Sequence, residues 1–390
     1  MKRQKESDTD RLSALPDHLL LHIIQFMTTQ QSAQTCVLSK RWENLWKSVT
    51  NINLHHFELY DGDIFEDFVS HFLSTRDNSI PLHTISYANG CRNYPYPAQT
   101  NIPIQIMEYA ASHDVQQLEI NTQVDHITST NIELPLSIFN CASLTSLCLC
   151  LWDATKPYTI MFPKSLNLPA LKTLKLSCFT FFTSDNGYAE PFSTCKMLSK
   201  LAIMACRLQG DDAQGICISN SKVSNLAIGK FYPTSKICKV VLCTPKLTSL
   251  TIKDIVATFP APSSSTCNLN LLEELKFECT HGPPTMGDDN LIGWLHLIAK
   301  VKIMTLSFTF LTLLVNVLKR NDSLKTQFPS FVKLKSLKVE SYPWESDEEA
   351  RELVTYLLRN SPPPATFVIS QEGVDLTSNG CVFVGFNIPR

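Results

Sequence analysis

Two histidine pairs come closest, by residue type and spacing, to metal or acid–base chemistry in this 390-residue sequence. His18 and His22 stand four residues apart, which would place both on one face of a helix. His55 and His56 are adjacent, so in a strand they would point to opposite faces and could not readily share an ion. Neither pair is joined by further ligands at fixed spacing or by a nucleophile with its base. The sequence therefore predicts no catalytic residue, no metal site and no cofactor.

The 14 cysteines do not have the spacing of a zinc site. None forms C-x-x-C, and the closest pairs are Cys148/Cys150 and Cys238/Cys243. The first residues, MKRQKESD, lack the apolar core of a signal peptide. We therefore expect a reducing compartment, the nucleus and/or the cytoplasm, in which the thiols stay free and pack as small apolar side chains.

Composition excludes several classes of partner. Lys and Arg number 34 against 36 Asp and Glu, which leaves a net charge of -2 and no overall basic field for nucleic acid. The 12 glycines form no phosphate-binding loop. The longest charge-free apolar run, residues 303–318, is shorter than the roughly 20 residues that span a bilayer, so it predicts a buried strand followed by a buried helix. We expect neither a nucleic-acid partner nor a membrane partner.

The elements that would position any functional side chain follow a repeat of the form apolar-x-x-apolar-x-apolar. It occurs eleven times, at intervals of 24 to 33 residues, starting at residues 49, 82, 115, 144, 171, 198, 223, 247, 272, 301 and 334. This spacing is typical of leucine-rich repeats, in which the first, fourth and sixth residues of each strand point into a solenoid core. The second, third and fifth residues should then face the concave side.

Lysines recur at these outward positions in neighbouring repeats. Lys172, Lys175 and Lys200 are predicted to share the concave face, and Lys222 and Lys246 lie just before the next two strands. These lysines could bind an acidic or phosphorylated segment of a protein. The alternative is that they are scattered lysines that only make the surface soluble.

The segment before the repeats, residues 10–46, has a different pattern. Pro16 and Asp17 are suited to begin a helix. We expect a second short helix around Val37 and a third that begins near Ser39 and carries Trp42, Leu45 and Trp46. Three short helices expose more apolar surface than so small a unit can bury, so the segment should need a partner.

The two ends of this segment resemble the F-box of plant proteins. The motifs are Leu15-Pro16-Asp17 and Leu38-Ser39-Lys40-Arg41-Trp42. The resemblance implies docking on the Skp adaptor of a cullin–RING ubiquitin ligase. It also implies a set of residues that supply adaptor contact and local core, two roles that the sequence does not separate: Leu15, Pro16, Leu20, Ile24, Val37, Leu38 and Trp42.

The end of the chain, FPSFVKLKSLKVESYPWESDEEARELVTYLLRNSPPPATFVI, resembles the FBD-type tail of plant F-box/leucine-rich-repeat proteins. It predicts strand Leu334–Val339, helix Glu348–Asn360 and strand Thr366–Ile369. Pro362-Pro363-Pro364-Ala365 departs from the usual wording of that tail, at the last turn. Earlier in the chain, Asp63–Leu73 has the periodicity of an amphipathic helix.

The resemblance implies an α/β fold, a three-helix F-box followed by a solenoid with a curved parallel sheet and with helices and loops on its convex side. The expected order is a disordered N-terminus (1–9), the F-box (10–48), the solenoid (49–327) and an FBD-like terminal repeat with a C-terminal cap (328–390). The implied function is that of a non-catalytic substrate-recognition subunit, with a Skp adaptor, a cullin bound through it and an unknown protein substrate as partners. Two alternatives stay open: a small-molecule receptor of the same architecture, and an interaction scaffold outside any ligase.

Overall fold

The computed structural model describes residues 12, 14–55, 62–89, 101–123, 133–152, 160–210, 212–229, 231–232, 239–253, 269–279, 295–296, 298–320, 326–342 and 345–371. The predicted disordered N-terminus lies outside these residues, as do His56 and the segment after Gln371.

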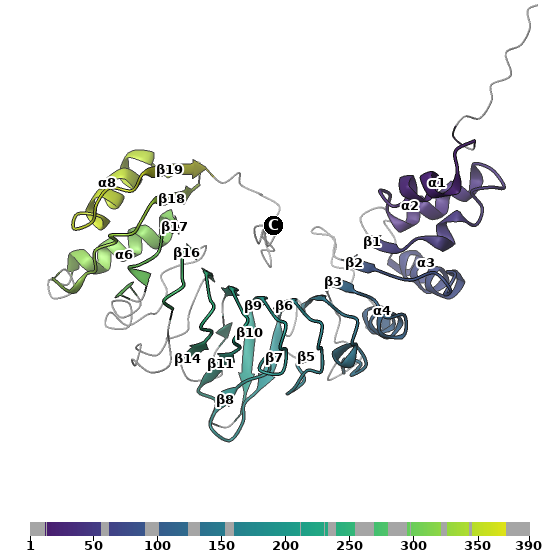
Figure 1. Cartoon of the computed structure of the whole chain (residues 1–390), viewed down its shortest axis with the longest axis horizontal. Helices are drawn as coiled ribbons and strands as arrows, with labels where there is room; N and C mark the ends of the chain where they lie inside the picture. The colour runs from purple at the N-terminus through teal and green to yellow at the C-terminus, as the bar shows by residue number, and fades with distance from the viewer. Residues whose placement is uncertain are drawn as a thin grey trace, which may run out of the picture.

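The chain forms an arch whose inner surface is one parallel sheet of 12 strands (Figure 1). The strands, in sheet order, are β1 (Asn51–His55), β2 (Thr84–Asn89), β3 (Gln117–Gln123), β4 (Ser146–Trp152), β6 (Thr173–Ser177), β9 (Lys200–Met204), β12 (Asn225–Ile228), β15 (Ser249–Lys253), β16 (Glu274–Glu278), β17 (Ile303–Ser307), β18 (Ser336–Ser341) and β19 (Thr366–Gln371). Each of the eleven predicted repeats coincides with one of the first eleven strands, and the predicted last strand coincides with β19.

The repeat pattern sets the register of this sheet. Side chains alternate between the two faces, so the fourth and sixth residues of each repeat form two continuous apolar rows inside the arch. In the first row Leu147 pairs with Leu174, and Leu174 pairs with Leu201. All three side chains are fully buried. Stacking of identical positions therefore gives one core that runs the length of the solenoid.

Helices cover the convex side at both ends of the arch (Figure 1). They are α3 (Gly62–Thr75) and α4 (Asn101–Ser112) near the N-terminal end, and α6 (Phe308–Arg320) and α8 (Asp347–Leu357) near the other. The helices expected over residues 63–73 and 348–360 are confirmed as α3 and α8. The charge-free run 303–318 is confirmed as a strand, β17, followed directly by α6, whose apolar face is buried.

The central repeats carry short strands on the convex side, where only helices and loops were expected. One ribbon has the order β13 (Phe231–Tyr232), β10 (Cys206–Gln209), β7 (Phe179–Phe182) and β5 (Ile160–Met161). A second has the order β14 (Lys239–Cys243), β11 (Gly215–Ser219) and β8 (Tyr188–Ala189). The main-sheet strands here start only about 25 residues apart, which leaves too little chain for a helix and its connections.

The N-terminal segment folds as a small helical module of residues 14–50. It contains α1 (Asp17–Ile24), α2 (Thr29–Gln34) and two 3₁₀ helices, Thr35–Val37 and Leu45–Ser48. Thr28 and Gln31 cap the start of α2 reciprocally. The predicted third helix is therefore a run of turns that ends in the 3₁₀ helix Leu45–Ser48.

Candidate docking surface and its connection to the solenoid

The helical module divides the seven residues predicted for adaptor contact into two groups. Leu20, Ile24 and Trp42 are core residues, with Trp42 only 1% exposed. Of the two roles predicted for the seven residues, these three side chains therefore have the role of local core, as part of the apolar core that continues into the solenoid. Leu15 is half-buried against the same core.

The remaining three residues, Pro16, Val37 and Leu38, lie on the surface. Val37 is 83% exposed, although it is an aliphatic side chain. Phe26, which was not among the predicted residues, is 80% exposed. The exposed large apolar side chains of the module form a set that we call the apolar docking set: Leu12, Leu19, Phe26, Val37 and Leu38. A solvated module gains nothing from exposing them, so they indicate a surface that a partner covers.

An ion pair holds the two signature motifs of the module together. Arg41 donates through Nε and Nη2 to Oδ1 of Asp17, at 3.0 and 2.6 Å. Asp17 begins α1 directly after Pro16, and Arg41 precedes the buried Trp42. Residues that are more than 20 positions apart in the sequence therefore meet at one place on the module.

The module is joined to the first repeat by side chains rather than by a flexible linker. Trp46 packs against Phe72 of α3 with ring centroids 5.2 Å apart and ring planes tilted by 36°. The buried guanidinium of Arg76 donates to the carbonyl oxygens of Val49 and Ile80, at 2.9 Å each. Trp46 therefore serves the junction, and Trp42 serves the core of the module.

The predicted lysine cluster on the concave face is divided by the structure. Lys175 lies on β6, paired with Cys148 of β4 and Ala202 of β9. Lys200 begins β9 and pairs with Thr173 of β6, so it does not lie directly opposite Lys175. Lys172 lies in the turn before β6 and is exposed at the edge of the sheet, so its placement on the concave face was wrong. The three lysines do not form a single concave cluster.

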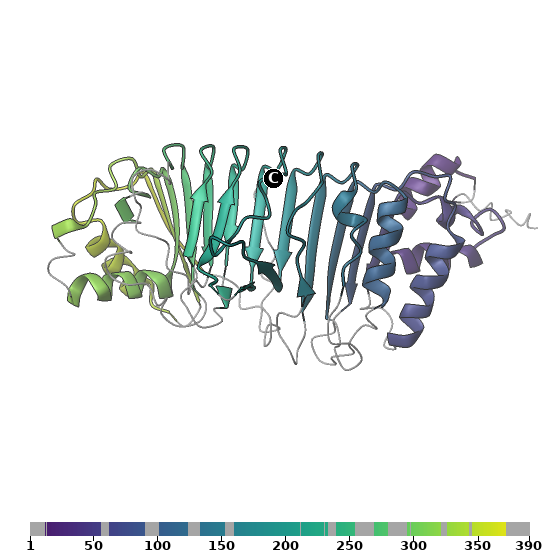
Figure 2. The same ribbon diagram turned by 90° about the horizontal axis from the view of Figure 1, so that it is seen from below.

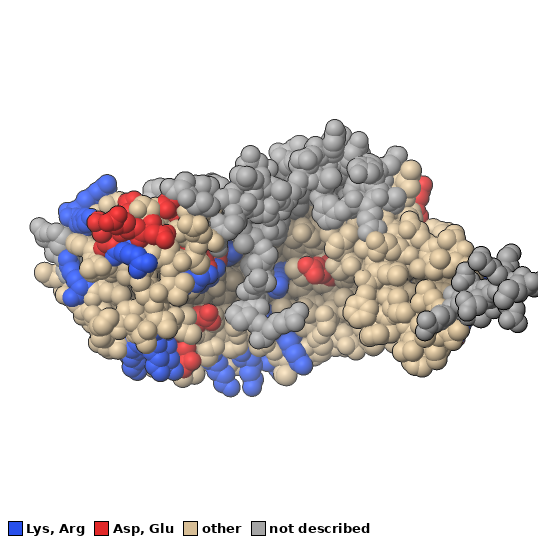
Figure 3. Space-filling model, turned by 90° about the horizontal axis from the view of Figure 1, so that it is seen from above, with Lys and Arg blue, Asp and Glu red and all other residues tan. Residues whose placement is uncertain are grey.

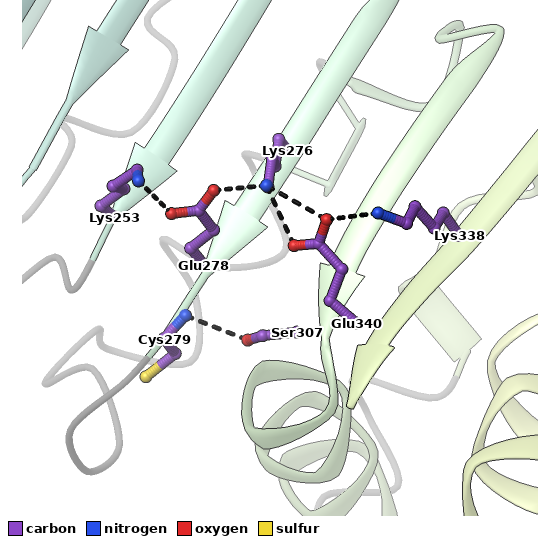
Figure 4. A network of polar contacts seen from close by, with 7 residues as sticks. All are labelled: Lys253, Lys276, Glu278, Cys279, Ser307, Lys338 and Glu340. Carbon is purple, nitrogen blue, oxygen red and sulfur yellow. Dashed lines mark hydrogen bonds and ion pairs between the residues drawn. The ribbon is translucent and has the colours of Figure 1, made fainter. Parts of the chain in front are cut away.

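The charges that do meet on the concave face lie over β15 to β18 (Figure 4). Lys253 pairs with Glu278, and Lys276 bridges Glu278 and Glu340 at 2.6 and 3.0 Å. Lys338 completes the network with Glu340 at 2.8 Å. Burial acts against ionisation of Glu340, but hydrogen bonds from Lys338 and Lys276 outweigh it and hold the pKa of Glu340 below its ordinary value.

This network follows from the repeat register. The intervening strand β17 has short side chains at its concave positions, so Lys276 of β16 reaches across it to β18. Lysine and glutamate two residues apart on β16 and β18 supply both signs on one face. Reading the fifth and seventh positions of these repeats together could have found the network from the sequence.

The candidate metal and thiol residues do not converge. Among the residues that the structure describes, no three His, Cys, Asp or Glu side chains are placed to hold a metal ion. The ten cysteines in the described ranges are free thiols, and burial raises the pKa of Cys148 to about 12. Cys206, the first residue of β10, is fully buried. None of the helices in the described part of the chain has the length and apolar character needed to cross a bilayer.

Comparison with known proteins agrees with this architecture. The F-box domain family matches residues 12–53, and the leucine-rich repeats of FBD-associated F-box protein At5g56370 match residues 105–257. The chain is 26% identical to the F-box protein At1g60400 of Arabidopsis thaliana, over 87% of this chain and 80% of that protein. It is 27% identical to the F-box/LRR-repeat protein At4g14103 of the same plant, over 92% and 91%.

A third relative, the F-box/LRR-repeat protein 13 of Arabidopsis thaliana, is 31% identical over 52% of this chain, a match that spans 42% of the relative. The matches therefore cover less than half of one relative and most of the other two. The chain therefore carries an F-box domain followed by leucine-rich repeats of the kind found in FBD-associated F-box proteins, and it is similar to F-box/LRR-repeat proteins of Arabidopsis thaliana.

Proposed function

We propose that this protein is the substrate-recognition subunit of an SCF-type cullin–RING ubiquitin ligase. Its F-box docks on a Skp-type adaptor, and its repeats bind a target protein. F-box/leucine-rich-repeat proteins generally act as such non-catalytic subunits, and the chain carries both an F-box domain and repeats that match theirs. The observation that carries the proposal is the apolar docking set, above all the 83% exposure of Val37 beside the exposed Leu38.

The energetics of the docking set favour a protein partner. Burying one large apolar side chain completely contributes about 1.5 to 3 kcal/mol. Phe26, Val37 and Leu38 are more than half exposed and so have most of that free energy still to gain on binding. Leu20, Ile24 and Trp42 have already gained it on folding. Adaptor contact is therefore proposed for the exposed set, with the buried set as its support.

The junction supports the second part of the proposal. Arg76 and Trp46 fix the F-box against the first repeat, so a target held by the solenoid would be presented at a constant distance and angle from the adaptor. In a ligase this geometry decides which lysines of the target reach the ubiquitin-loaded enzyme. The protein itself supplies binding and orientation and leaves the chemistry to other subunits.

Co-purification with a Skp adaptor tests the proposal. Val37→Asp places a charge at the most exposed residue of the docking set and leaves the core intact, so we expect loss of at least nine-tenths of the bound adaptor. Leu136→Asp is the matched control, because Leu136 is also an exposed aliphatic residue but lies in the solenoid. Equal adaptor binding by Val37→Asp and the unmodified chain would refute the proposal. A ubiquitination assay with the reconstituted complex then separates a ligase subunit from a scaffold.

The proposed function also places the protein where cullin–RING ligases act, in the nucleus and/or the cytoplasm. Imaging of a fluorescent fusion in plant cells checks this placement, and secretion of the fusion would contradict it.

A further inference from the structure

The turns that precede the main-sheet strands form an uninterrupted edge of the arch. Figure 2 shows them as narrow turns along the upper edge. In the seven repeats from β6 to β18 these turns contain eight lysines and one carboxylate, Glu273. We call the eight lysines the lysine ridge: Lys172, Lys196, Lys222, Lys246, Lys300, Lys302, Lys333 and Lys335. All of them are exposed except Lys302, which is half-buried.

The ridge concentrates charge on a chain that is otherwise acidic. Eight lysines and one glutamate give +7, and since the whole chain carries -2, the rest of it carries -9. Figure 3 shows blue side chains in a row along the lower edge of the molecule, with little red among them. The four turns before β1 to β4 contain one lysine, Lys47, and one aspartate, Asp114. The ridge is thus a property of one part of the solenoid and not of the repeat in general.

The backbone holds the ridge in a fixed register. The N–H of Lys172 donates to the carbonyl of Thr145 at 2.8 Å, and the N–H of Lys335 donates to the carbonyl of Lys302 at 2.8 Å. Neighbouring strands lie about 4.8 Å apart, so the seven turns span about 29 Å. The distance of about 4.8 Å between neighbouring strands is shorter than the Debye length of about 8 Å at physiological salt. The electrostatic potentials of lysines in neighbouring turns therefore add.

One titratable group already responds to this potential. A hydrogen bond from Lys302 lowers the pKa of Glu273, and the charges of Lys302 and Lys335 lower it further. Glu273 is exposed, so the shift reflects its basic neighbours and not burial.

Apolar side chains stand between the lysines. Met197, Leu271 and Val332 lie in the same turns and are each at least half exposed. None of the exposed residues of the seven turns is an aromatic residue or an arginine, the side chains on which single-stranded nucleic acid stacks. A nucleic acid would set its hydrated phosphates against the aliphatic groups, and a uniformly anionic lipid surface would oppose Glu273. A protein segment can place acidic side chains against the lysines and aliphatic side chains against Met197, Leu271 and Val332.

We propose that the lysine ridge is a docking surface for an acidic protein segment with interspersed aliphatic residues. An extended segment of about nine residues spans the ridge. The binding does not depend on adaptor docking. That the bound segment belongs to a ubiquitination target rests on the proposed function.

Fluorescence anisotropy with the full chain tests the ridge. The probe is a labelled 15-residue peptide of five Glu-Glu-Leu repeats, and its neutral counterpart has five Gln-Gln-Leu repeats. The ridge variant combines Lys222→Glu, Lys246→Glu and Lys333→Glu. The control variant combines Lys164→Glu, Lys319→Glu and Arg320→Glu, three exposed residues outside the ridge turns, and makes the same change in net charge.

The acidic peptide should bind the unmodified chain and lose affinity as salt rises from 50 to 200 mM. The ridge variant should bind it at least tenfold more weakly, whereas the control variant should change the affinity less than twofold. Circular dichroism checks that both variants are folded. The same three ridge positions changed to Gln provide a milder variant, expected to weaken binding about threefold.

Absence of peptide binding, equal weakening by both variants, or stronger binding of the neutral peptide would overturn the proposal. Tighter binding of a 15-nucleotide oligothymidylate, or of vesicles with 30% phosphatidylserine, would assign the ridge to another class of partner and equally overturn it. The Val37→Asp variant should bind the acidic peptide as the unmodified chain does. Failure of the ridge proposal would therefore appear only in the peptide assay, and failure of the adaptor proposal only in co-purification.

Discussion

Replacing Arg76 by methionine should loosen the F-box from the solenoid. The guanidinium of Arg76 is buried and donates to carbonyl oxygens on both sides of the junction: Val49 at 2.9 and 3.2 Å, Ile80 at 2.9 Å, Asp77 at 3.2 Å and Pro81 at 3.4 Å. Methionine fills a similar volume but donates nothing. The carbonyls of Val49 and Ile80 would lose their closest side-chain donor in a site that is closed to water.

The magnitude follows from these contacts. A hydrogen bond from a charged donor contributes about 1.5 to 3 kcal/mol, so loss of the two shortest bonds destabilises the junction by about 3 to 6 kcal/mol. Burial of the methionine side chain offsets about 1 to 2 kcal/mol of this. We expect a net loss of about 2 to 4 kcal/mol in the free energy of opening the junction. The free energy of opening the junction in Arg76→Lys should lie between those of the unmodified chain and Arg76→Met, because a single ammonium group reaches fewer carbonyl oxygens than a guanidinium.

Hydrogen exchange measured by mass spectrometry is the assay, with urea unfolding beside it. Exchange of residues 45–55 and 76–85 should accelerate by at least tenfold in Arg76→Met, while the central strands keep their protection. Arg41→Met is the control, because its pair with Asp17 is exposed and such pairs contribute about 0 to 1 kcal/mol. Unchanged exchange at the junction in Arg76→Met would show that the arginine does not hold the two parts together.

Three further predictions concern the solenoid and its thiols. Glu340→Gln should reduce stability at pH 7 by about 1 to 2 kcal/mol. Since folding lowers the pKa of Glu340, the unmodified chain should lose this stabilisation as pH falls from about 4.5 through the folded pKa. Urea unfolding at several pH values measures this loss. An equal loss of stability at acidic pH in Glu340→Gln would show that Glu340 is not its cause. Gly215→Ala should lower the midpoint of thermal unfolding by several degrees, because a Cβ would lie 2.0 Å from the carbonyl oxygen of Lys239; an unchanged midpoint would mean that β11 and β14 do not pair as described. Of the ten cysteines in the described part of the chain, iodoacetamide at pH 8 should label Cys36 first and leave Cys206 unlabelled while the chain is folded, because Cys36 is exposed and burial raises the pKa of Cys206. Equal labelling of Cys36 and Cys206 would refute both placements.

The main sheet could be predicted because each repeat has apolar residues at the positions that face the core. Leu174 and Leu201 are apolar at the same position of their repeats, and only one register buries both. Helix α4 was not predicted, although Ile102, Ile106 and Ala110 are buried at helical spacing. Pro103 lies in its first turn, where proline is compatible with a helix.

The convex strands could not be predicted. β8, for example, has two residues, Tyr188 and Ala189, and carries no periodic pattern. Such strands form only when neighbouring repeats stack and align their backbones, a long-range effect that no local window contains. The same dependence on stacking explains why the lysines of six separate turns form one ridge.

The docking surface was only partly predictable. The sequence identified the F-box and its signature residues, but it could not tell Leu19 from Leu20, which are both apolar and adjacent. The two leucines differ in exposure because one side of α1 packs on the module core, which buries Leu20 and leaves Leu19 exposed. Which side faces the core depends on how the helices pack together and not on the composition of the helix.

Hydroxyl-radical footprinting of the chain, free and saturated with a Skp adaptor, tests the central claim most directly because it reports which side chains the adaptor covers. Phe26 is 80% exposed in the free chain and should lose most of its labelling in the complex. Met197 of the solenoid is also exposed and should be labelled equally in both states. That result would place the adaptor on the docking set. Full labelling of Phe26 and Leu38 in the saturated complex, or failure of the folded chain to form the complex, would contradict it.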